Sequence, residues 1–227
     1  METFQRVFQP GFEEFFEKDY SLKGKWAREV FGNSHPLVLE LGCGKGEYTL
    51  ALARRDQKRN FMGVDIKGAR LWTGAKKANE EDIRNAAFLR TRIEFIRSFF
   101  APEEIDEIWI TFPDPQLKKR RHKKRLTGST FLNAYRTLLK DKGEIHLKTD
   151  NEELYSYTKE MATYNQLEIL YDTVDLYKSG IENDILSVQT TYEKRFLEEG
   201  LTIKYISFRL PSGREIREIP VEESDDE

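Results

Sequence analysis

The stretch LVLELGCGKGEYTL (37–50) joins a short apolar run to a glycine-rich turn and then to a segment with helical spacing. An apolar run of this length, followed directly by glycine, is typical of a strand that is buried on both faces of a parallel sheet. Gly42, Gly44 and Gly46 alternate after the run, and glycines placed in this way let the backbone turn sharply and approach a ligand closely. The stretch therefore predicts a strand, a loop suited to ligand binding and a helix in succession.

The same alternation of strand and helix continues toward the C-terminus. Periods near 2 and near 3.6 residues predict strands at 37–41, 60–66, 86–90, 104–112 and 143–149, and helices at 47–55, 69–81, 128–140 and 151–164. Alternating strands and helices with short connections predict βαβ units and a parallel sheet. The segments 167–177 and 202–210 then follow without an ordinary helix between them. We expect them to close the sheet as a hairpin-like pair, which makes the sheet mixed at its end.

Composition and charge limit the class of protein. The chain has 227 residues and a net charge of −3, but its charge is segregated into a basic central run and an acidic C-terminus. The single cysteine, Cys43, fits a reducing compartment. The sequence shows neither a signal peptide nor an apolar stretch long enough to span a bilayer, so we expect a cytoplasmic protein with no membrane partner. We expect an N-terminal arm at 1–30, a single domain at 31–216 and a disordered acidic tail at 217–227.

Two carboxylates accompany the glycine loop. Glu40 precedes Gly42 by two residues, and Asp65 ends the second predicted strand, where an acid can bind both hydroxyls of a ribose. A dinucleotide and S-adenosylmethionine both use this arrangement. Glu47 breaks the usual dinucleotide fingerprint and disfavours a pyrophosphate at the helix N-terminus. The pattern E-x-G-x-G-x-G resembles motif I of Rossmann-like methyltransferases, and this resemblance favours S-adenosylmethionine over NAD.

A second chemical motif lies at ITFPDPQLKKRRHKKRL (110–126). Asp114 follows a predicted strand and is held between two prolines, which restrict the backbone on both sides of it. Ligands of open α/β sheets bind beyond the carboxyl ends of the strands, so Asp114 is a candidate for the same crevice as the glycine loop. An Asx turn that closes the strand is the alternative. The basic run 118–125 predicts a clamp for a polyanion such as nucleic acid, and a solvated loop is its alternative.

Four stretches together resemble the bacterial tRNA (guanine-N7)-methyltransferase family. They are KGKWAREVFGNSHPLVLELGCGKGEYT (23–49), FPDPQLKKRRHKKRL (112–126), HLKTDNEELYSY (146–157) and TTYEKRFLEEG (190–200). The resemblance covers about residues 23–210. It implies a Rossmann-like class I methyltransferase with a mostly parallel seven-stranded sheet and an antiparallel last strand. It also implies methyl transfer from S-adenosylmethionine to N7 of the variable-loop guanine at position 46 of tRNA, by a monomer or a homodimer.

The resemblance also implies roles for residues at the matching positions. The implied cofactor-binding residues are Glu40, Gly42, Gly44, Gly46, Asp65, Thr91, Arg92 and Asp114, and Asp114 is also the implied catalytic residue. The implied substrate-binding residues are Lys118, Asp150, Thr190, Thr191, Tyr192 and Glu193. The implied RNA contacts are Arg120, Arg121, His122, Lys123, Lys124 and Arg125. Local alternatives are a helix N-cap for Asp150 and a capping box for Thr190 and Glu193.

The chain departs from the family pattern in three places. Gln116 and Leu117 replace the usual Trp and Pro, Arg121 stands where His is usual, and Thr91 and Arg92 stand where the family has an acid or amide near the adenine. His35, His122 and His146 are scattered and Cys43 has no partner cysteine, so we expect no metal site.

Competing hypotheses keep part of this interpretation and change the rest. A methyltransferase with another RNA or a small molecule as acceptor keeps the donor, although the basic run argues against a small molecule. A non-catalytic RNA-binding protein on the same scaffold keeps the polyanion, but Glu40, the glycines and Asp114 argue against loss of activity. An NAD-dependent oxidoreductase keeps the glycine loop.

N7 of guanine carries a free lone pair at neutral pH, so we expect positioning and carboxylate stabilisation of the cationic product to dominate catalysis.

Overall fold

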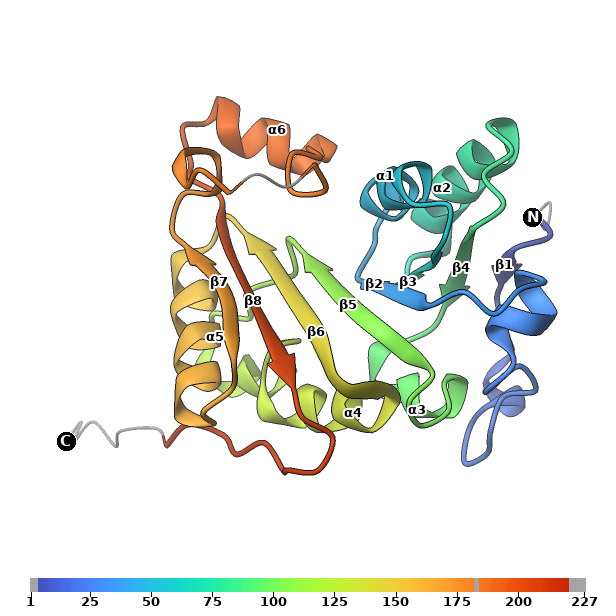
Figure 1. Ribbon diagram of the computed structural model, residues 1–227, viewed down its shortest axis with the longest axis horizontal. Coiled ribbons are helices and arrows are strands. Elements are labelled where there is room, and N and C mark those ends of the chain that lie inside the picture. Colours follow the sequence, from blue (N-terminus) through green and yellow to red (C-terminus); the bar gives the residue numbers. More distant parts are fainter. Residues whose placement is uncertain (1–3, 182–183, 221–227) are drawn as a thin grey trace.

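A computed structural model describes residues 4–181 and 184–220 of the chain. Within them eight strands form one sheet in the order β1-β4-β3-β2-β5-β6-β8-β7 (Figure 1). The strands are β1 (Val7–Phe8), β2 (Leu37–Leu41), β3 (Asn60–Asp65), β4 (Ala86–Arg90), β5 (Ile105–Thr111), β6 (Leu139–Thr149), β7 (Ile169–Thr173) and β8 (Lys204–Leu210). Only the pairings of β8, with β6 and with β7, are antiparallel. The predicted mixed α/β sheet with an antiparallel last strand is thus confirmed.

Helices cover both faces of this sheet (Figure 1). They are α1 (Glu47–Arg55), α2 (Gly68–Glu80), α3 (Ile96–Phe99), α4 (Ser129–Leu138), α5 (Glu152–Tyr164) and α6 (Thr191–Glu198). Shorter helical turns lie at Phe12–Glu14, Trp26–Val30, Ile93–Phe95, Lys119–Lys124 and Leu176–Lys178. One hydrophobic core joins the sheet to α3, α4 and α5, and the other joins it to α1 and α2. The alternation of side chains along β2 sends Leu37, Leu39 and Leu41 to the first core and Val38 to the second.

The strand order places a crevice at the middle of the sheet. From β2 the chain runs outward to β3 and β4, with β1 at that edge of the sheet. After β4 it crosses back to β5, beside β2, and runs outward to β6 on the other side, where β8 and β7 lie beyond it. The order therefore reverses between β2 and β5, and ligands of open α/β sheets bind outside the carboxyl ends of the strands at such a reversal. The glycine loop follows β2 and the proline-framed Asp114 follows β5, so both lie at this point.

The structure corrects the expectation for the C-terminal third. The segment between 167–177 and 202–210 contains α6, which the sequence did not predict as an ordinary helix. The two strands pair antiparallel as expected, and β8 lies between β6 and β7, so that β7 forms the edge of the sheet. An apolar strand gains most when it is buried between two neighbours, and all residues of β8 except Arg209 are buried.

The segment predicted as an N-terminal arm contributes to the fold. Val7 and Phe8 pair with β4 and give the sheet its eighth strand. Trp26 is fully buried, and its indole Nε1 donates a hydrogen bond of 2.7 Å to the Phe99 carbonyl oxygen. Near the other terminus, Glu218 accepts hydrogen bonds from Tyr157 and Ser129, while the predicted acidic tail from 221 onward lies outside the described residues.

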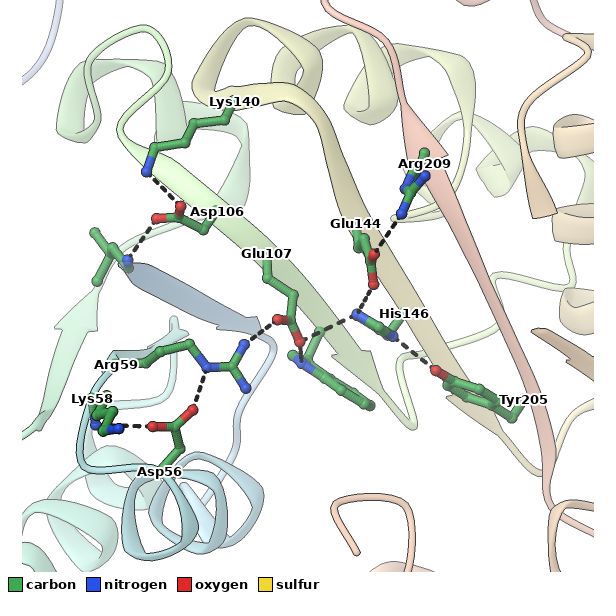
Figure 2. A network of polar contacts seen from close by, with 12 residues as sticks. Asp56, Lys58, Arg59, Asp106, Glu107, Lys140, Glu144, His146, Tyr205 and Arg209 are labelled. Carbon is green, nitrogen blue, oxygen red and sulfur yellow. Dashed lines mark hydrogen bonds and ion pairs between the residues drawn. The ribbon is translucent and has the colours of Figure 1, made fainter. Parts of the chain in front are cut away.

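A network of polar side chains crosses β5, β6 and β8 on the α1 side of the sheet (Figure 2). Glu107 pairs with Arg59 and with the His146 ring, and His146 Nδ1 lies 2.8 Å from the Tyr205 hydroxyl. Burial alone raises the pKa of Glu107, but the nearby His146 ring and the Arg59 guanidinium outweigh it and lower that pKa to about 2. The Trp109 ring stacks on His146 at 4.0 Å between centroids. These contacts connect β5, β6 and β8 to one another and to Arg59, which immediately precedes β3 on the other side of the reversal point.

Candidate functional site

The glycine loop adopts a backbone that other residues rarely accept. Gly42, Gly44 and Gly46 have φ angles of 77°, 56° and 68°. A Cβ atom added at Gly42 or Gly44 meets nothing within 4 Å, so these two positions are open to a ligand. A Cβ at Gly46 falls 2.4 Å from the Phe88 ring. Gly46 is therefore needed for the turn into α1 and for the close packing against Phe88, while Gly42 and Gly44 leave their backbone open to a ligand.

Glu40 is buried beneath this loop, on the face of β2 that is turned toward α1. The side chain accepts hydrogen bonds from the Thr49 backbone N–H at 2.8 Å and from the hydroxyls of Thr49 and Thr111, the latter at 2.6 Å. Burial raises the pKa of Glu40 to about 7, although these hydrogen bonds act in the opposite direction. A cation that binds nearby would favour the ionised carboxylate. Glu40 is thus both a support for the loop and a candidate partner for a positively charged ligand.

Asp65 ends β3 and ties it to the glycine loop. Its Oδ2 accepts the Gly44 N–H at 2.9 Å, and its Oδ1 accepts the Lys67 N–H at 2.8 Å. Each carboxylate oxygen can accept a further hydrogen bond, so Asp65 keeps capacity for ligand hydroxyls. Thr91 lies beside it and donates its backbone N–H to the Asp65 carbonyl oxygen. Arg92 is exposed and pairs with Glu94 at 2.8 Å.

Two cavities adjoin at the carboxyl edge of the sheet and share Gly42, Arg70 and Phe112. The first, which we call the glycine-loop cavity, has a volume of about 510 Å³. Its other lining residues are Glu40, Cys43, Gly44, Lys45, Glu47, Thr111, Thr190, Thr191, Tyr192, Arg195 and Phe196. The second, the Asp114 cavity, has a volume of about 490 Å³. Its other lining residues are Asp65, Ile66, Thr91, Arg92, Ile93, Glu94, Pro113, Asp114, Gln116, Lys124, Leu126 and Phe131.

Asp114 projects from a constrained turn. Phe112 and Gln116 on either side of it have φ angles of 49° and 51°, in the left-handed region that side-chain-bearing residues seldom occupy. Asp114 Oδ1 accepts the Gln116 backbone N–H at 2.9 Å, which is the Asx turn expected as the alternative. The side chain is exposed and lines the Asp114 cavity. The turn and the placement in the crevice therefore coexist.

The N-terminus of α6 forms the opposite wall of the glycine-loop cavity. Thr190 caps the helix by accepting the Glu193 N–H at 3.2 Å. The Glu47 carboxylate, at the start of α1, accepts both the Thr191 N–H at 2.7 Å and the Thr191 hydroxyl hydrogen. A carboxylate between two helix N-termini is favoured by both macrodipoles. Glu47 thus holds α6 against the glycine loop, and Tyr192, 45% exposed, is presented at the cavity.

Glu193 departs from the expectation that it binds substrate. It is fully buried and forms an ion pair with Lys148 at 2.8 Å, and it accepts the Tyr177 hydroxyl hydrogen at 2.7 Å. Lys148, also fully buried, donates further hydrogen bonds to the carbonyl oxygens of Leu186 and Val188. Burial lowers the pKa of Lys148, while the Glu193 carboxylate opposes that shift. The capping box is half formed, because Glu193 turns inward instead of bonding to the N-cap backbone.

The remaining expected substrate residues lie outside these two cavities. Asp150 is half-buried at the end of β6, and its backbone oxygen accepts a hydrogen bond from Lys204. The expected alternative of Asp150 as a helix cap is wrong, since Asn151 caps α5 by accepting the Leu154 N–H. Lys118 is exposed at the start of the basic run.

The basic run divides into an exposed part and a buried end. Arg120, Arg121 and Lys123 are exposed, His122 is half-buried, and Lys124 lines the Asp114 cavity. Arg125 differs from the expectation of an RNA contact, because its side chain is only 3% exposed. Its guanidinium pairs with Glu153, donates to the Pro115 carbonyl oxygen at 3.1 Å and lies over the Tyr157 ring at 4.5 Å. Arg125 therefore anchors the base of the proline-framed turn.

Several site residues were not identified from the sequence. Thr49 and Thr111 hold Glu40, Glu47 holds α6, and Arg70 lies between the cavities. Helical spacing could have identified two more lining residues. Residues 195 and 196 lie three and four positions after Tyr192, on the same helix face, and they also line the glycine-loop cavity. Arg70 lies in the first turn of the helix after the Asp65 strand, a position that lies near the crevice in this fold.

Across residues 4–181 and 184–220 we find no group of three or more His, Cys, Asp or Glu side chains arranged to hold a metal ion. In the same part of the chain no helix combines the length and apolar character needed to span a bilayer.

The strand order, the glycine loop and the acid at the end of β3 are those of a Rossmann-like α/β protein. A family model described as a putative methyltransferase matches residues 34–206, so the chain is a Rossmann-like methyltransferase. The chain belongs, more narrowly, to the tRNA (guanine-N(7)-)-methyltransferase family. The relative from Porphyromonas gingivalis is 53% identical over 92% of this chain and 86% of its own length. The relative from Bacteroides thetaiotaomicron is 50% identical over 98% of this chain and 87% of its own length.

Solved structures agree on the fold. The 16S rRNA methyltransferase KamB matches with a TM-score of 0.62 and 12% identity, over 81% of this chain and 92% of its own. An antibiotic-related methyltransferase matches with a TM-score of 0.60 and 20% identity, over 85% of this chain and 96% of its own. At these identities the likeness shows a common architecture.

Proposed function

We propose that this protein transfers the methyl group of S-adenosylmethionine to N7 of the guanine at position 46 in the variable loop of tRNA. The observation that carries the proposal is the junction of the two cavities. There the open glycine loop and two carboxylates adjoin Asp114 and the N-terminus of α6. The relatives named tRNA (guanine-N(7)-)-methyltransferase supply the substrate class. Such a substrate implies a cytoplasmic enzyme.

The donor set fits S-adenosylmethionine. This ligand carries an ammonium and a sulfonium but no phosphate. Glu40, with its pKa near 7, lines the cavity floor, and Gly42 and Gly44 leave open space above the backbone. Asp65 retains acceptor capacity for ribose hydroxyls, and Thr91 and Ile93 line the cavity beyond it. Glu47, which would repel a pyrophosphate at the start of α1, is already bonded to Thr191.

The chemistry asks for positioning more than for acid or base catalysis. When bound, S-adenosylmethionine supplies the methyl group, and N7 of guanine supplies the lone pair that receives it. No side chain has to remove a proton from N7. The methylated ring is cationic, and the Asp114 carboxylate, held by its turn, is placed to stabilise that charge. The side chain of Asp114 can also accept hydrogen bonds from guanine N1–H and N2–H, which adenine cannot offer in the same way.

The contacts with RNA are part of the same proposal. Extrusion of the target base would bring it to the cavities at the carboxyl edge of the sheet. Lys118, Arg120, Arg121 and Lys123 are exposed beside the Asp114 turn, where cations can bind the phosphates of the variable loop. We assign Thr190, which lines the glycine-loop cavity, to the surroundings of the target nucleotide, and Glu193 to the support of α6.

A methyl-transfer assay with labelled S-adenosylmethionine tests the proposal. One unmodified tRNA transcript carries guanine at position 46, and its matched control carries adenine there. Label in the guanine transcript alone, recovered as 7-methylguanine, is the expected result. Label in both transcripts would overturn the assigned position. Label in neither, with cofactor binding demonstrated separately, would overturn the assigned acceptor.

A further inference from the structure

Arg70 is the charged residue that the two cavities have in common. It is half-buried in the first turn of α2, and the other shared residues, Gly42 and Phe112, carry no charge. Its guanidinium therefore faces the passage between the glycine loop on one side and Asp114 on the other. A group at this junction can contact a ligand that extends from one cavity into the other.

This guanidinium has no anionic partner within the part of the chain that the structure describes. None of the acids that line the two cavities forms an ion pair with Arg70 in the described part of the chain: Glu94 pairs with Arg92, and Asp114 Oδ1 accepts the Gln116 N–H. Glu40 accepts from Thr49 and Thr111, Glu47 accepts from Thr191, and both oxygens of Asp65 accept backbone N–H groups. A guanidinium offers five donors in a planar fork that matches an oxyanion. Half-buried and without a carboxylate, Arg70 is suited to an anion that arrives with a ligand.

Tyr192 indicates which ligand that is. Arg70 Cζ lies 6.0 Å from the centre of the Tyr192 ring, so α2 and α6 approach each other across the glycine-loop cavity. The ring is 45% exposed, and the Glu47–Thr191 contact fixes the helix that carries it. An exposed aromatic ring next to an unpaired arginine is the combination that binds a stacked base together with its phosphate. Lys45, exposed on the rim of the same cavity, adds a second cation.

We propose that Arg70 binds a phosphate that flanks the target guanosine, and that Tyr192 stacks on a base of the same segment. The inference rests on the proposed function, because it takes the ligand to be RNA. The carboxylate of the cofactor's amino-acid end is the other oxyanion that could reach this region. The phosphate is favoured because Arg70 lies over the exposed Tyr192 ring of α6, which offers a stacking surface for a base, whereas Asp65, the expected ribose partner, lines the other cavity. Arg70 thereby orients the extruded nucleotide toward the methyl donor.

The test compares Arg70→Met with Lys76→Met, a matched control. Lys76 is a cation of the same helix, is paired with Glu80 at 3.7 Å and is absent from both cavities. Arg70→Met is expected to raise the KM for tRNA about tenfold or more, since a charge-assisted contact is lost, and to leave the affinity for S-adenosylhomocysteine unchanged. Lys76→Met should change neither. A fall in cofactor affinity with an unchanged KM for tRNA would overturn the assignment and give Arg70 to the cofactor carboxylate.

Modified tRNA identifies the phosphate directly. An uncharged methylphosphonate is placed at each of the two phosphates that flank the target guanosine, one at a time. At one of the two positions, the methylphosphonate should raise the KM for tRNA of the wild-type protein and of Lys76→Met by the same factor as the Arg70→Met substitution does. It should not raise the KM of Arg70→Met any further. An Arg70→Met protein that still distinguishes phosphate from methylphosphonate at both places would overturn the proposal. Failure of the wild-type protein to methylate any tRNA would instead reject the proposed function.

Discussion

Asp114 shows how the site depends on single backbone conformations. The turn that carries it requires left-handed φ angles at Phe112 and Gln116, and such residues cost roughly 1–3 kcal/mol each. The Asx bond to Gln116 and the ring contact between Phe112 and Phe196 at 5.7 Å help to hold the turn. Strain of this kind persists where a side chain must be held in one direction. The two prolines allowed a rigid backbone around Asp114 to be predicted from the sequence. The left-handed conformations of Phe112 and Gln116 could not be predicted from residue type.

Substitution of Asp114 by Asn tests its charge separately from its turn. Asparagine keeps the acceptor for the Gln116 N–H, so the turn is expected to survive, but it removes the negative charge that would face the cationic product. We expect turnover to fall about 100-fold or more, with the affinities for tRNA and S-adenosylhomocysteine nearly unchanged. Single-turnover methylation and direct binding measurements separate the two effects. Wild-type turnover in Asp114→Asn would remove Asp114 from catalysis.

Glu40 should make cofactor binding depend on pH. Its folded-state pKa is raised to about 7, so the folded protein holds this proton more tightly than the unfolded chain does. The contribution of Glu40 to the unfolding free energy therefore falls as pH rises from about 4.5 toward 7 and is constant above that range. Because a cationic ligand favours the ionised form of Glu40, the affinity for S-adenosylmethionine should increase as the pH rises toward about 7 and level off above it.

Calorimetric titration of S-adenosylmethionine across this pH range measures the effect. Glu40→Gln, which keeps the shape and a hydrogen-bond acceptor, should bind more weakly above the folded-state pKa and show a flatter pH profile. An affinity of the wild-type protein that does not change with pH would show that Glu40 is not the group that senses the cofactor's charge.

At the scale of elements, α6 is the part of the site that the sequence described least well. Its residues were expected to bind substrate directly, and a short capped helix was only the alternative. The structure shows the capped helix, with Thr190 as its N-cap, and places Tyr192 at the glycine-loop cavity, while substrate binding by these residues stays a prediction. The inward turn of Glu193 depends on Lys148 of β6, 45 residues away, and a partner so remote cannot be inferred from local spacing. The predicted elements from β2 to α5 were local and strongly periodic, and the structure confirms them to within a few residues.

The Lys148–Glu193 pair should hold α6 to the sheet. Glu193→Gln leaves the Lys148 ammonium fully buried without a counter-charge, which we expect to destabilise the protein by about 3–5 kcal/mol. The double change Lys148→Met with Glu193→Leu, which removes both charges, should recover most of that loss. Urea unfolding measures both variants.

A surface pair supplies the control for this prediction. Lys159 and Asp172 are 2.5 Å apart but are 49% and 27% exposed, so Lys159→Met should cost less than about 1 kcal/mol. A Glu193→Gln protein that is no less stable than Lys159→Met would show that the buried pair does not anchor α6.

At the scale of the whole molecule, the sequence predicted the sheet but not its edges. Buried strands such as β2 and β5 have apolar runs that local periodicity detects. The edge strand β1 has only two residues, and the insertion of β8 between β6 and β7 depends on long-range pairing. The crevice at the strand reversal followed from the alternation of elements, so Glu40, Asp65 and Asp114 were located correctly at the sheet's carboxyl edge. Whether they act as the family resemblance implies remains a prediction.

The segregation of charge over the molecule leads to the last prediction, which concerns the salt dependence of tRNA binding. Each phosphate contact releases counterions and adds about 0.7–0.9 to the slope of log affinity against log salt. The triple substitution of Arg120, Arg121 and Lys123 by Gln should therefore weaken tRNA binding and lower that slope by about 2–3. Arg125 is left intact because it is buried beneath the turn.

The control replaces Lys58, Lys140 and Lys142 by Gln, three exposed cations near the amino ends of β3 and β6. Both variants lose three positive charges, so the effect of net charge is the same in each. Fluorescence titration of tRNA over a range of salt concentrations gives the two slopes. Equal slopes would mean that tRNA senses only the protein's net charge, and the basic run would then be a solvated loop.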